Sequence, residues 1–284
     1  MSEQHVKPAN PRRLGYKALE ILLGRLPTGR WARSIPGLPA LYTSRLMARR
    51  DHTGLHSGIY PTYDAAMAAI PPSRKAGWDH EGAAQLWVDQ IDPVRLSTYP
   101  IFFWLDQLYR ENHALVDVGG SIGLTYYGYR RLGRIPAGAS WTVVEVGAIA
   151  RQGTEIARRE AAASLSFVDD VAALSRCDVL LSAGALQFMP VSIPGLLESL
   201  PQKPRYIVLN KLPLTPGSDC WTLQNYGPAV TPNRLFNEQR FLQYFAGHGY
   251  RLRDRWAVED LDLLIPFYPE RFIKTFAGFV FERS

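Results

Sequence analysis

Short, continuous apolar runs alternate with longer amphipathic stretches from residue 114 onward. A short apolar run bounded by turn residues is typical of a strand buried on both faces, and the stretches between the runs are long enough for helices. Alternation of this kind predicts a parallel sheet wrapped by helices. The expected strands are Ala114–Val118, Trp141–Val146, Leu165–Val168, Asp178–Ser182 and Arg205–Asn210.

Two later apolar runs, Tyr250–Val258 and Phe272–Phe281, are separated by a segment without a helix-sized periodic pattern. We therefore expect them to close the sheet as an antiparallel pair. The predicted fold class is α/β, with a Rossmann-like seven-stranded sheet that is mostly parallel and whose last strand is antiparallel. Such a sheet differs from the six parallel strands of a dinucleotide-binding domain.

The N-terminal part follows another pattern, because glycines and prolines interrupt residues 52–75 between two helical pieces. We predict that residues 1–90 form a helical cap or lid and that residues 91–284 form the catalytic domain. A chain of 284 residues with 46% hydrophobic content can bury one substantial core and still carry such an accessory segment.

The net charge of +6 is concentrated in residues 1–50, where ten lysines and arginines face only Glu3 and Glu20. This segment includes an amphipathic helix whose apolar stripe is Leu14, Ala18, Ile21 and Leu22. The helix either packs on the domain with a solvated basic face or makes a weak contact with an anionic surface such as a membrane. Nucleic acid is not an expected partner, because the chain has no recognisable nucleic-acid-binding motif.

The cysteines Cys177 and Cys220 fit neither a disulfide framework nor a metal-binding pair, which favours a reducing compartment. The first residues lack the apolar core of a signal peptide, and no stretch has the roughly 18 apolar residues of a membrane span. We expect a cytoplasmic protein without an integral membrane segment. No metal is expected either, because Thr53 and Gly54 separate His52 from His56 and disfavour a helical metal-binding face.

The segment Leu115–Leu124 holds three glycines, Gly119, Gly120 and Gly123, where a buried strand turns into a helix. Glycines there let a flat ligand approach the main chain closely. The nicotinamide pattern G-x-G-x-x-G fails, since glycines would be needed at 121 and 124. A phosphate-binding P-loop fails too, because no G-K-[ST] follows.

Carboxylates at the strand ends narrow the ligand further. Asp117 would repel a pyrophosphate but suits a cationic amino-acid group such as that of S-adenosylmethionine (SAM). Glu145 ends the second strand, where it can accept hydrogen bonds from two ribose hydroxyls. Asp169 or Asp170 could accept a bond from an adenine amino group, although Asp170 could equally cap the helix that follows it. The alternative for the glycines is a turn that only connects strand to helix.

Leu115–Gly123 resembles the first motif of class I SAM-dependent methyltransferases, and Val143–Glu145 resembles their second. Phe167–Asp170, Asp178–Gln187 and Tyr206–Asn210 are similar to the motifs after strands three, four and five. With Gly58–Tyr63 and Gln224–Asn225, residues 55–284 resemble a bacterial family of methyltransferases whose substrates are mostly unassigned. The resemblance implies SAM contacts at Asp117, Gly119, Gly120, Ser121, Gly123, Glu145, Asp169, Ser182 and Gln187.

The acceptor side of this site holds few charged groups. An acidic or basic pair often follows strand five in the family, whereas this chain has Asn210-Lys211, which leaves an acid–base role open at that point. The polar residues expected nearest the acceptor, as catalytic candidates, are Gln187, Asn210, Asn225 and Tyr226. The alternative for Asn210, Asn225 and Tyr226 is ordinary loop hydrogen bonding.

The resulting prediction is a SAM-dependent methyltransferase that acts on a small molecule or biosynthetic intermediate and releases S-adenosylhomocysteine. An in-line displacement at oxygen or nitrogen mainly requires alignment and exclusion of water. One alternative is cyclisation of SAM to a cyclic amino acid with release of methylthioadenosine. A second alternative is a non-catalytic SAM-binding protein, although such a protein would be expected to lose the loop glycines or Glu145.

Overall fold

The computed structural model describes residues 30–51, 54–75 and 94–284. The predicted amphipathic helix with its stripe at Leu14, Ala18, Ile21 and Leu22 lies outside the described residues, and so does His52.

The main sheet has seven strands in the order β10-β11-β6-β5-β2-β3-β4. All pairs from β4 to β6 are parallel, whereas β11 runs antiparallel to both β6 and β10. Five parallel strands followed by an antiparallel pair confirm the predicted class I methyltransferase sheet. The strands are β2 (Ala114–Val118), β3 (Ser140–Val144), β4 (Leu165–Val168), β5 (Val179–Ala183), β6 (Tyr206–Leu212), β10 (Tyr250–Val258) and β11 (Phe276–Arg283).

The predicted strand bounds differ from the observed ones mainly at the last strand, which begins at Phe276 rather than at Phe272. The preceding residues form a short 3-10 helix, η6 (Pro269–Arg271), and Phe272 is largely exposed. A proline fixes its own backbone angle and lacks an N–H donor, so Pro269 favours this turn over continued pairing.

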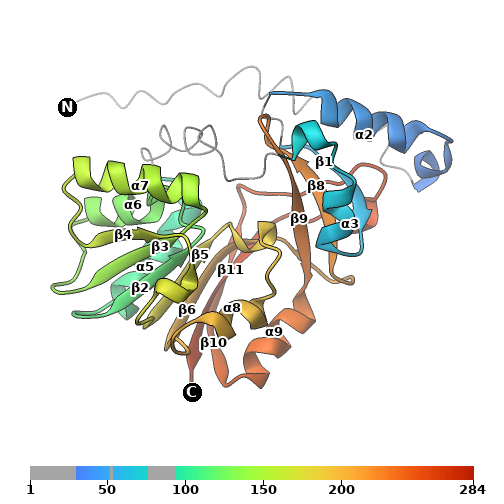
Figure 1. The fold of residues 1–284 in the computed structure, drawn as a ribbon. Coiled ribbons are helices and arrows are strands. Elements are labelled where there is room, and N and C mark those ends of the chain that lie inside the picture. The colour runs from blue at the N-terminus through green and yellow to red at the C-terminus, as the bar shows by residue number, and fades with distance from the viewer. Residues whose placement is uncertain (1–29, 52–53, 76–93) are drawn as a thin grey trace, which may run out of the picture.

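Helices cover both faces of the sheet, with α6 and α7 on one side and α8 and α9 on the other (Figure 1). Helix α5 packs on the same face as α6 and α7. The alternation along β11 shows why both faces are apolar, because Val280 joins one core while Phe279 and Phe281 join the other. The helices are α5 (Tyr99–Leu108), α6 (Leu124–Arg131), α7 (Gly147–Arg159), α8 (Ile193–Ser199) and α9 (Glu238–Gly247).

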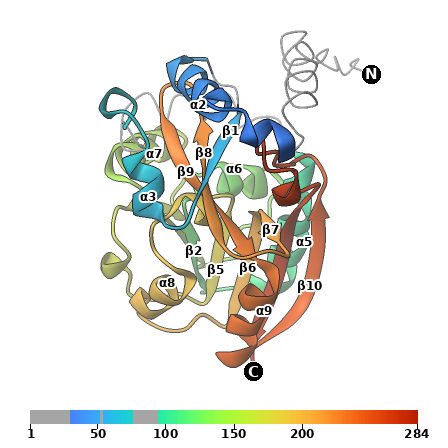
Figure 2. The same ribbon diagram turned by 90° about the vertical axis from the view of Figure 1, so that its right-hand side faces the viewer.

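A second sheet, in the order β1-β8-β9-β7, combines the N-terminal segment with an insertion that follows β6. Figure 2 shows the blue β1 beside the orange β8 and β9. The sequence pattern predicts only helical pieces in the N-terminal segment and no strands in the insertion, so β1, β7, β8 and β9 are not foreseen by that pattern. The strands of this sheet are β1 (His56–Tyr60), β7 (Leu214–Thr215), β8 (Cys220–Asn225) and β9 (Val230–Asn237). The N-terminal segment also contains α2 (Leu38–Ala48), α3 (Tyr63–Ala68) and η2 (Pro72–Arg74).

Two buried polar side chains join the N-terminal segment to the turn between β8 and β9. Arg74 donates to the carbonyls of Arg49, Gly227 and Pro228 at 2.8–3.3 Å. Asn225 donates from Nδ2 to the carbonyls of Leu46, at 2.6 Å, and Arg49, at 3.2 Å. Its Oδ1 accepts the N–H of Gly227 at 2.7 Å. Carbonyls at a helix C-terminus lack partners within the helix, so these donors satisfy the end of α2.

Replacing Asn225 by alanine should lower the free energy of unfolding by about 2–3 kcal/mol, because it leaves buried backbone groups without partners. Urea denaturation followed by circular dichroism measures the change. The exposed Gln239→Ala on α9 is the control and should stay within about 0.5 kcal/mol of the parent protein. A loss of less than 1 kcal/mol for Asn225→Ala would contradict this role.

Candidate functional site

The carboxyl ends of β2, β3, β5 and β6 meet at one edge of the main sheet. Strand β2 pairs with β3 on one side and with β5 on the other, both in parallel. The chain therefore leaves β2 at the point where the strand order reverses, which is where ligands of open α/β sheets bind. The residues after β2 and β3 include the predicted glycine turn and Glu145.

The backbone of the glycine turn passes through the left-handed region, which glycine adopts readily. Gly119 and Gly123 have φ of 70° and 90°, and Ser121 between them has a φ of 55°. A Cβ on Gly119 would lie 2.0 Å from the Cβ of Ala185, in the loop after β5. A Cβ on Gly120 would lie 2.5 Å from Oδ2 of Asp117. Both glycines are required sterically, and the turn passes close to the loop after β5.

Asp117 lies directly beneath this turn and is completely buried. Its Oδ2 accepts a hydrogen bond from Nε1 of Trp141 at 3.3 Å, while Oδ1 has no partner among the described residues. Burial raises the pKa of Asp117 to about 7, although the indole hydrogen bond opposes this and the nearby Glu145 adds to it. A buried carboxylate with an unsatisfied oxygen favours a cationic ligand above the thin Gly120 backbone.

Glu145 connects the end of β3 to the glycine turn. Its Oε2 accepts the N–H of Ser121 at 3.1 Å, and its Oε1 accepts the N–H of Val146 at 3.0 Å. Burial raises its pKa and the two backbone bonds lower it. Each carboxylate oxygen keeps a second lone pair, so Glu145 can still accept two hydroxyl donors.

The acids after β4 are both exposed. Asp170 caps η4 (Val171–Ala173) through a 2.9 Å bond from the N–H of Ala172, which is the capping alternative raised for it. Asp169 lies beside it at the same edge of the sheet.

The loop after β5 brings two of the catalytic candidates together. Gln187 is buried in η5 (Leu186–Phe188), where Nε2 donates to the carbonyl of Gly184 at 3.1 Å and Oε1 has no partner among the described residues. The ring of Tyr226 packs edge-on against Phe188, with centroids 5.6 Å apart. The Tyr226 hydroxyl donates to Oε1 of Gln224 at 3.0 Å, and burial raises its pKa. The β8–β9 turn thus lies against the candidate site.

The remaining predicted residues make structural hydrogen bonds. Ser182 is buried and donates to the carbonyl of Val118 at 2.9 Å, which joins the ends of β5 and β2. Asn210 is completely buried, donates to the carbonyl of Ser97 at 2.8 Å and accepts from Nε1 of Trp256 at 3.0 Å. The Asn225 amide is occupied by the bonds to α2 described above. The geometry therefore gives Asn210 and Asn225 a scaffold role and does not place them as free acceptor contacts.

Two residues that the site uses were not singled out from the sequence. Trp141 was taken only as the start of a strand, yet its indole is the partner of Asp117. Lys211 enters the sequence prediction only as part of Asn210-Lys211, the pair that departs from the family pattern after strand five, yet its side chain lies against Gly184. A tryptophan on the strand beside the one that carries a buried acid is a signal that could have revealed the Trp141–Asp117 hydrogen bond.

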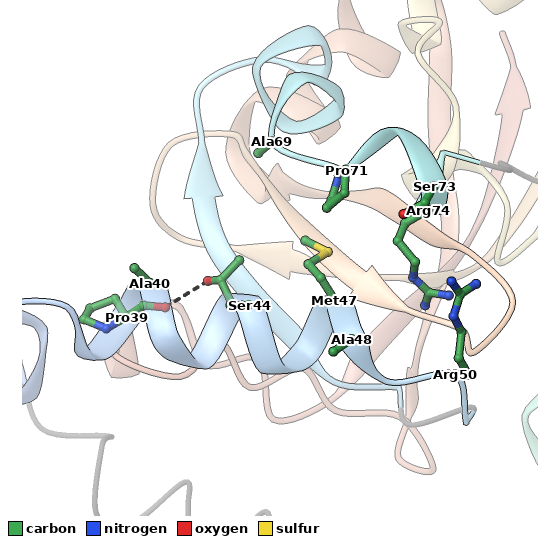
Figure 3. Close-up of a pocket in the computed structure, with 11 residues that line it drawn as sticks. Pro39, Ala40, Ser44, Met47, Ala48, Arg50, Ala69, Pro71, Ser73 and Arg74 are labelled. Carbon is green, nitrogen blue, oxygen red and sulfur yellow. Dashed lines mark hydrogen bonds between the residues drawn. The ribbon is translucent and has the colours of Figure 1, made fainter.

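A separate hollow of about 660 Å³ lies between α2 and the α3–η2 segment (Figure 3). It contains none of the predicted site residues and no carboxylate, and Arg50 and Arg74 stand at one end of it. Its lining offers neither the acidic groups nor the glycine turn found at the sheet edge, so we place the candidate site at the sheet edge.

Two further features are absent from residues 30–51, 54–75 and 94–284. In that part of the chain no helix is both long enough and apolar enough to cross a membrane. The same residues contain no group of three or more His, Cys, Asp or Glu side chains placed to hold a metal ion. Cys177 and Cys220 are buried free thiols, and burial raises the pKa of both.

No protein-family model matches this chain, and the search of curated proteins gives no significant match. Among solved structures, the chain is similar to the 1,6-didemethyltoxoflavin N1-methyltransferase of Burkholderia thailandensis, with 17% identity, a TM-score of 0.49 and coverage of 73% of this chain and 84% of that one. It is also similar to the magnesium protoporphyrin IX methyltransferase of Synechocystis PCC 6803, with 12% identity, a TM-score of 0.48 and coverage of 73% and 93%. The strand order of this chain defines its fold independently of these distant similarities.

Gly119→Ala should destabilise the protein by about 1–3 kcal/mol more than Gly133→Ala, as measured by urea denaturation. Both glycines have positive φ, 70° and 68°, so both variants carry the backbone strain of about 1–2 kcal/mol. Only position 119 adds a clash, because a Cβ at Gly133 meets nothing within 4 Å. Equal losses in the two variants would show that the loop after β5 does not press on the turn.

Asp117 should make the protein less stable as the pH rises from about 4 to about 7. Its folded-state pKa of about 7 lies above the unfolded value, so the native state binds the extra proton and loses that stabilisation as the proton leaves. The stability of the parent protein relative to Asp117→Asn should fall across this window by at most about 4 kcal/mol. Denaturation curves at several pH values test this, and parallel pH profiles for the two proteins would contradict it.

Proposed function

We propose that this protein is a SAM-dependent methyltransferase that acts on a small molecule or biosynthetic intermediate. The observation that carries the proposal is the combination at one sheet edge of a sterically required glycine turn, the buried Asp117 beneath it and Glu145 at the end of the neighbouring strand. The chain lacks the G-x-G-x-x-G pattern of nicotinamide sites and the G-K-[ST] sequence of P-loops, so these ligands fit the site less well.

The described groups fit the parts of SAM. The unsatisfied Oδ1 of Asp117 favours the cationic amino-acid portion, and the remaining lone pairs of Glu145 suit the ribose diol. Side chains at Gly119 and Gly120 would collide with Ala185 and Asp117, so glycines are needed for the turn to keep this path. Asp169 or the second oxygen of Asp170 is available to the adenine amino group. Bound SAM supplies an electrophilic methyl group on a sulfonium.

The residues of this chain then align the acceptor and exclude water from it. Gln187 and Tyr226 are the proposed acceptor-side contacts, because the loop after β5 brings both against the candidate site. Phe188 packs with Tyr226 and gives this side an apolar wall. Ser182 contributes by holding the ends of β2 and β5 together, since its hydroxyl is committed to the carbonyl of Val118.

The setting of the enzyme is part of the proposal. Two buried free thiols suit a reducing compartment, which supports a cytoplasmic location. We also propose that residues 1–90 act as a cap on the catalytic residues 91–284, and that the basic charge within residues 1–50 favours weak contact with an anionic surface.

Titration calorimetry with S-adenosylhomocysteine tests the binding assignment. Glu145→Gln should weaken affinity by about tenfold or more, because an amide replaces one of the two acceptors offered to the diol. Glu155→Gln is a matched control, since Glu155 is exposed on α7 away from the turn. Absence of S-adenosylhomocysteine binding by the parent protein, or unchanged affinity in Glu145→Gln, would overturn the assignment.

Product analysis by mass spectrometry completes this test. With SAM and a panel of small acceptors, the proposed activity yields a methylated product and S-adenosylhomocysteine. Methylthioadenosine formed from SAM alone would instead support cyclisation, and tight binding without either product across the panel would support a non-catalytic role.

A further inference from the structure

Lys211 is an unusual residue at the edge of the candidate site. It lies in β6 one position after Asn210, and its backbone φ is 60°, a value that residues other than glycine seldom adopt. No hydrogen bond or ion pair connects its ammonium group to any other described residue. A strained backbone that carries a charge with no hydrogen-bonded partner among the described residues is characteristic of a functional position, because neither feature stabilises the fold.

The strained backbone places this side chain over the loop that closes the site. The aliphatic part of Lys211 lies against Gly184, where an added Cβ would meet its Cδ at 3.2 Å. Gly184 is the residue whose carbonyl binds Gln187, and the next residue, Ala185, contacts the glycine turn. Lys211 and the glycine turn therefore contact neighbouring residues of the same loop, Gly184 and Ala185.

A second cation is held near the same place by Asn210. The bond from Asn210 to the carbonyl of Ser97 fastens residues 94–98 to the end of β6, two positions from Arg95. The charge of Arg95 acts on both Lys211 and Tyr226. Burial and Arg95 lower the pKa of Lys211 to about 8, while Asp260 opposes this shift, so the ammonium remains mostly protonated at neutral pH.

We propose that Lys211, assisted by Arg95, binds an anionic group of the methyl acceptor, either a carboxylate or a phosphate. This inference rests on the proposed function, because it interprets the cations as part of the acceptor side of a SAM site. The charge of Asp260 acts on Lys211, but no described residue donates or accepts a hydrogen bond with its ammonium group. A partly buried ammonium in this situation gains from an anionic ligand, which restores the interactions lost on burial. Lys211 is thus a specificity residue, and the substrate class is small anionic molecules.

Calorimetry with three matched probes tests the inference on the full chain, with and without saturating S-adenosylhomocysteine. The probes are benzoate, phenyl phosphate and benzamide, which share a ring and differ in the charged group. At least one of the two anions should bind ten times more tightly than benzamide. The anion that binds more tightly shows whether the site prefers a carboxylate or a phosphate. Lys211→Met should reduce the preference to less than threefold, whereas Lys211→Arg should keep most of it.

Lys203→Met is the control, since Lys203 is exposed in the loop before β6 and should leave the preference unchanged. Unchanged affinity for S-adenosylhomocysteine in Lys211→Met shows that this variant is folded. Equal binding of the three probes, no binding of either anion, or a preference that survives in Lys211→Met overturns the inference. Anion binding that depends on Lys211 in a protein that does not bind S-adenosylhomocysteine would support the anion site and reject the methyltransferase assignment.

Discussion

The hydrogen bond between the Trp141 indole and the buried carboxylate of Asp117 connects the core of this protein to its candidate site. Trp141 is packed edge-on against Tyr109 and Tyr126, so the indole is held by the main aromatic cluster of the sheet. Burying a carboxylate is costly unless its oxygens are satisfied, and the indole satisfies only one of them. The core therefore fixes the acid beneath the glycine turn and leaves it receptive to a cationic group.

The second sheet depends on a different kind of constraint, in which buried amide and guanidinium groups act together with an apolar cluster at the joints. That cluster consists of Met47, Ala66, Ile70, Trp221, Leu223 and Val230. Asn225 and Arg74 satisfy carbonyls at the end of α2 and in the β8–β9 turn. Asn210 does the same between β6 and residues 94–98. These side chains hold the segments that carry Tyr226 and Arg95, so they help to fix where those residues lie relative to the loop after β5.

The main sheet, and the gathering of Asp117, Gly119 and Glu145 at one edge of it, could be predicted because the carboxyl ends of parallel strands meet at the same edge. The second sheet could not be predicted. Strand β8 is buried on both faces yet contains Thr222 and Asn225, which have backbone partners far along the chain. Asn210 and Asn225 are catalytic candidates in the sequence because an asparagine that binds a ligand and one that binds a distant backbone carbonyl look alike there.

At the sheet edge, the acidic side chains lie on one side of the loop from Gly184 to Gln187 and the basic side chains lie on the other. Asp117 and Glu145 stand on the β2–β3 side, and Lys211 stands on the β6 side with Arg95 near it. If Asp117, Glu145 and Lys211 served only the fold, pairing the opposite charges would relieve the cost of burying them, yet no ion pair joins Lys211 to either acid among the described residues. The separation is instead suited to two ligands of opposite charge, a cationic one above Asp117 and an anionic one beside Lys211, brought together across the same short loop.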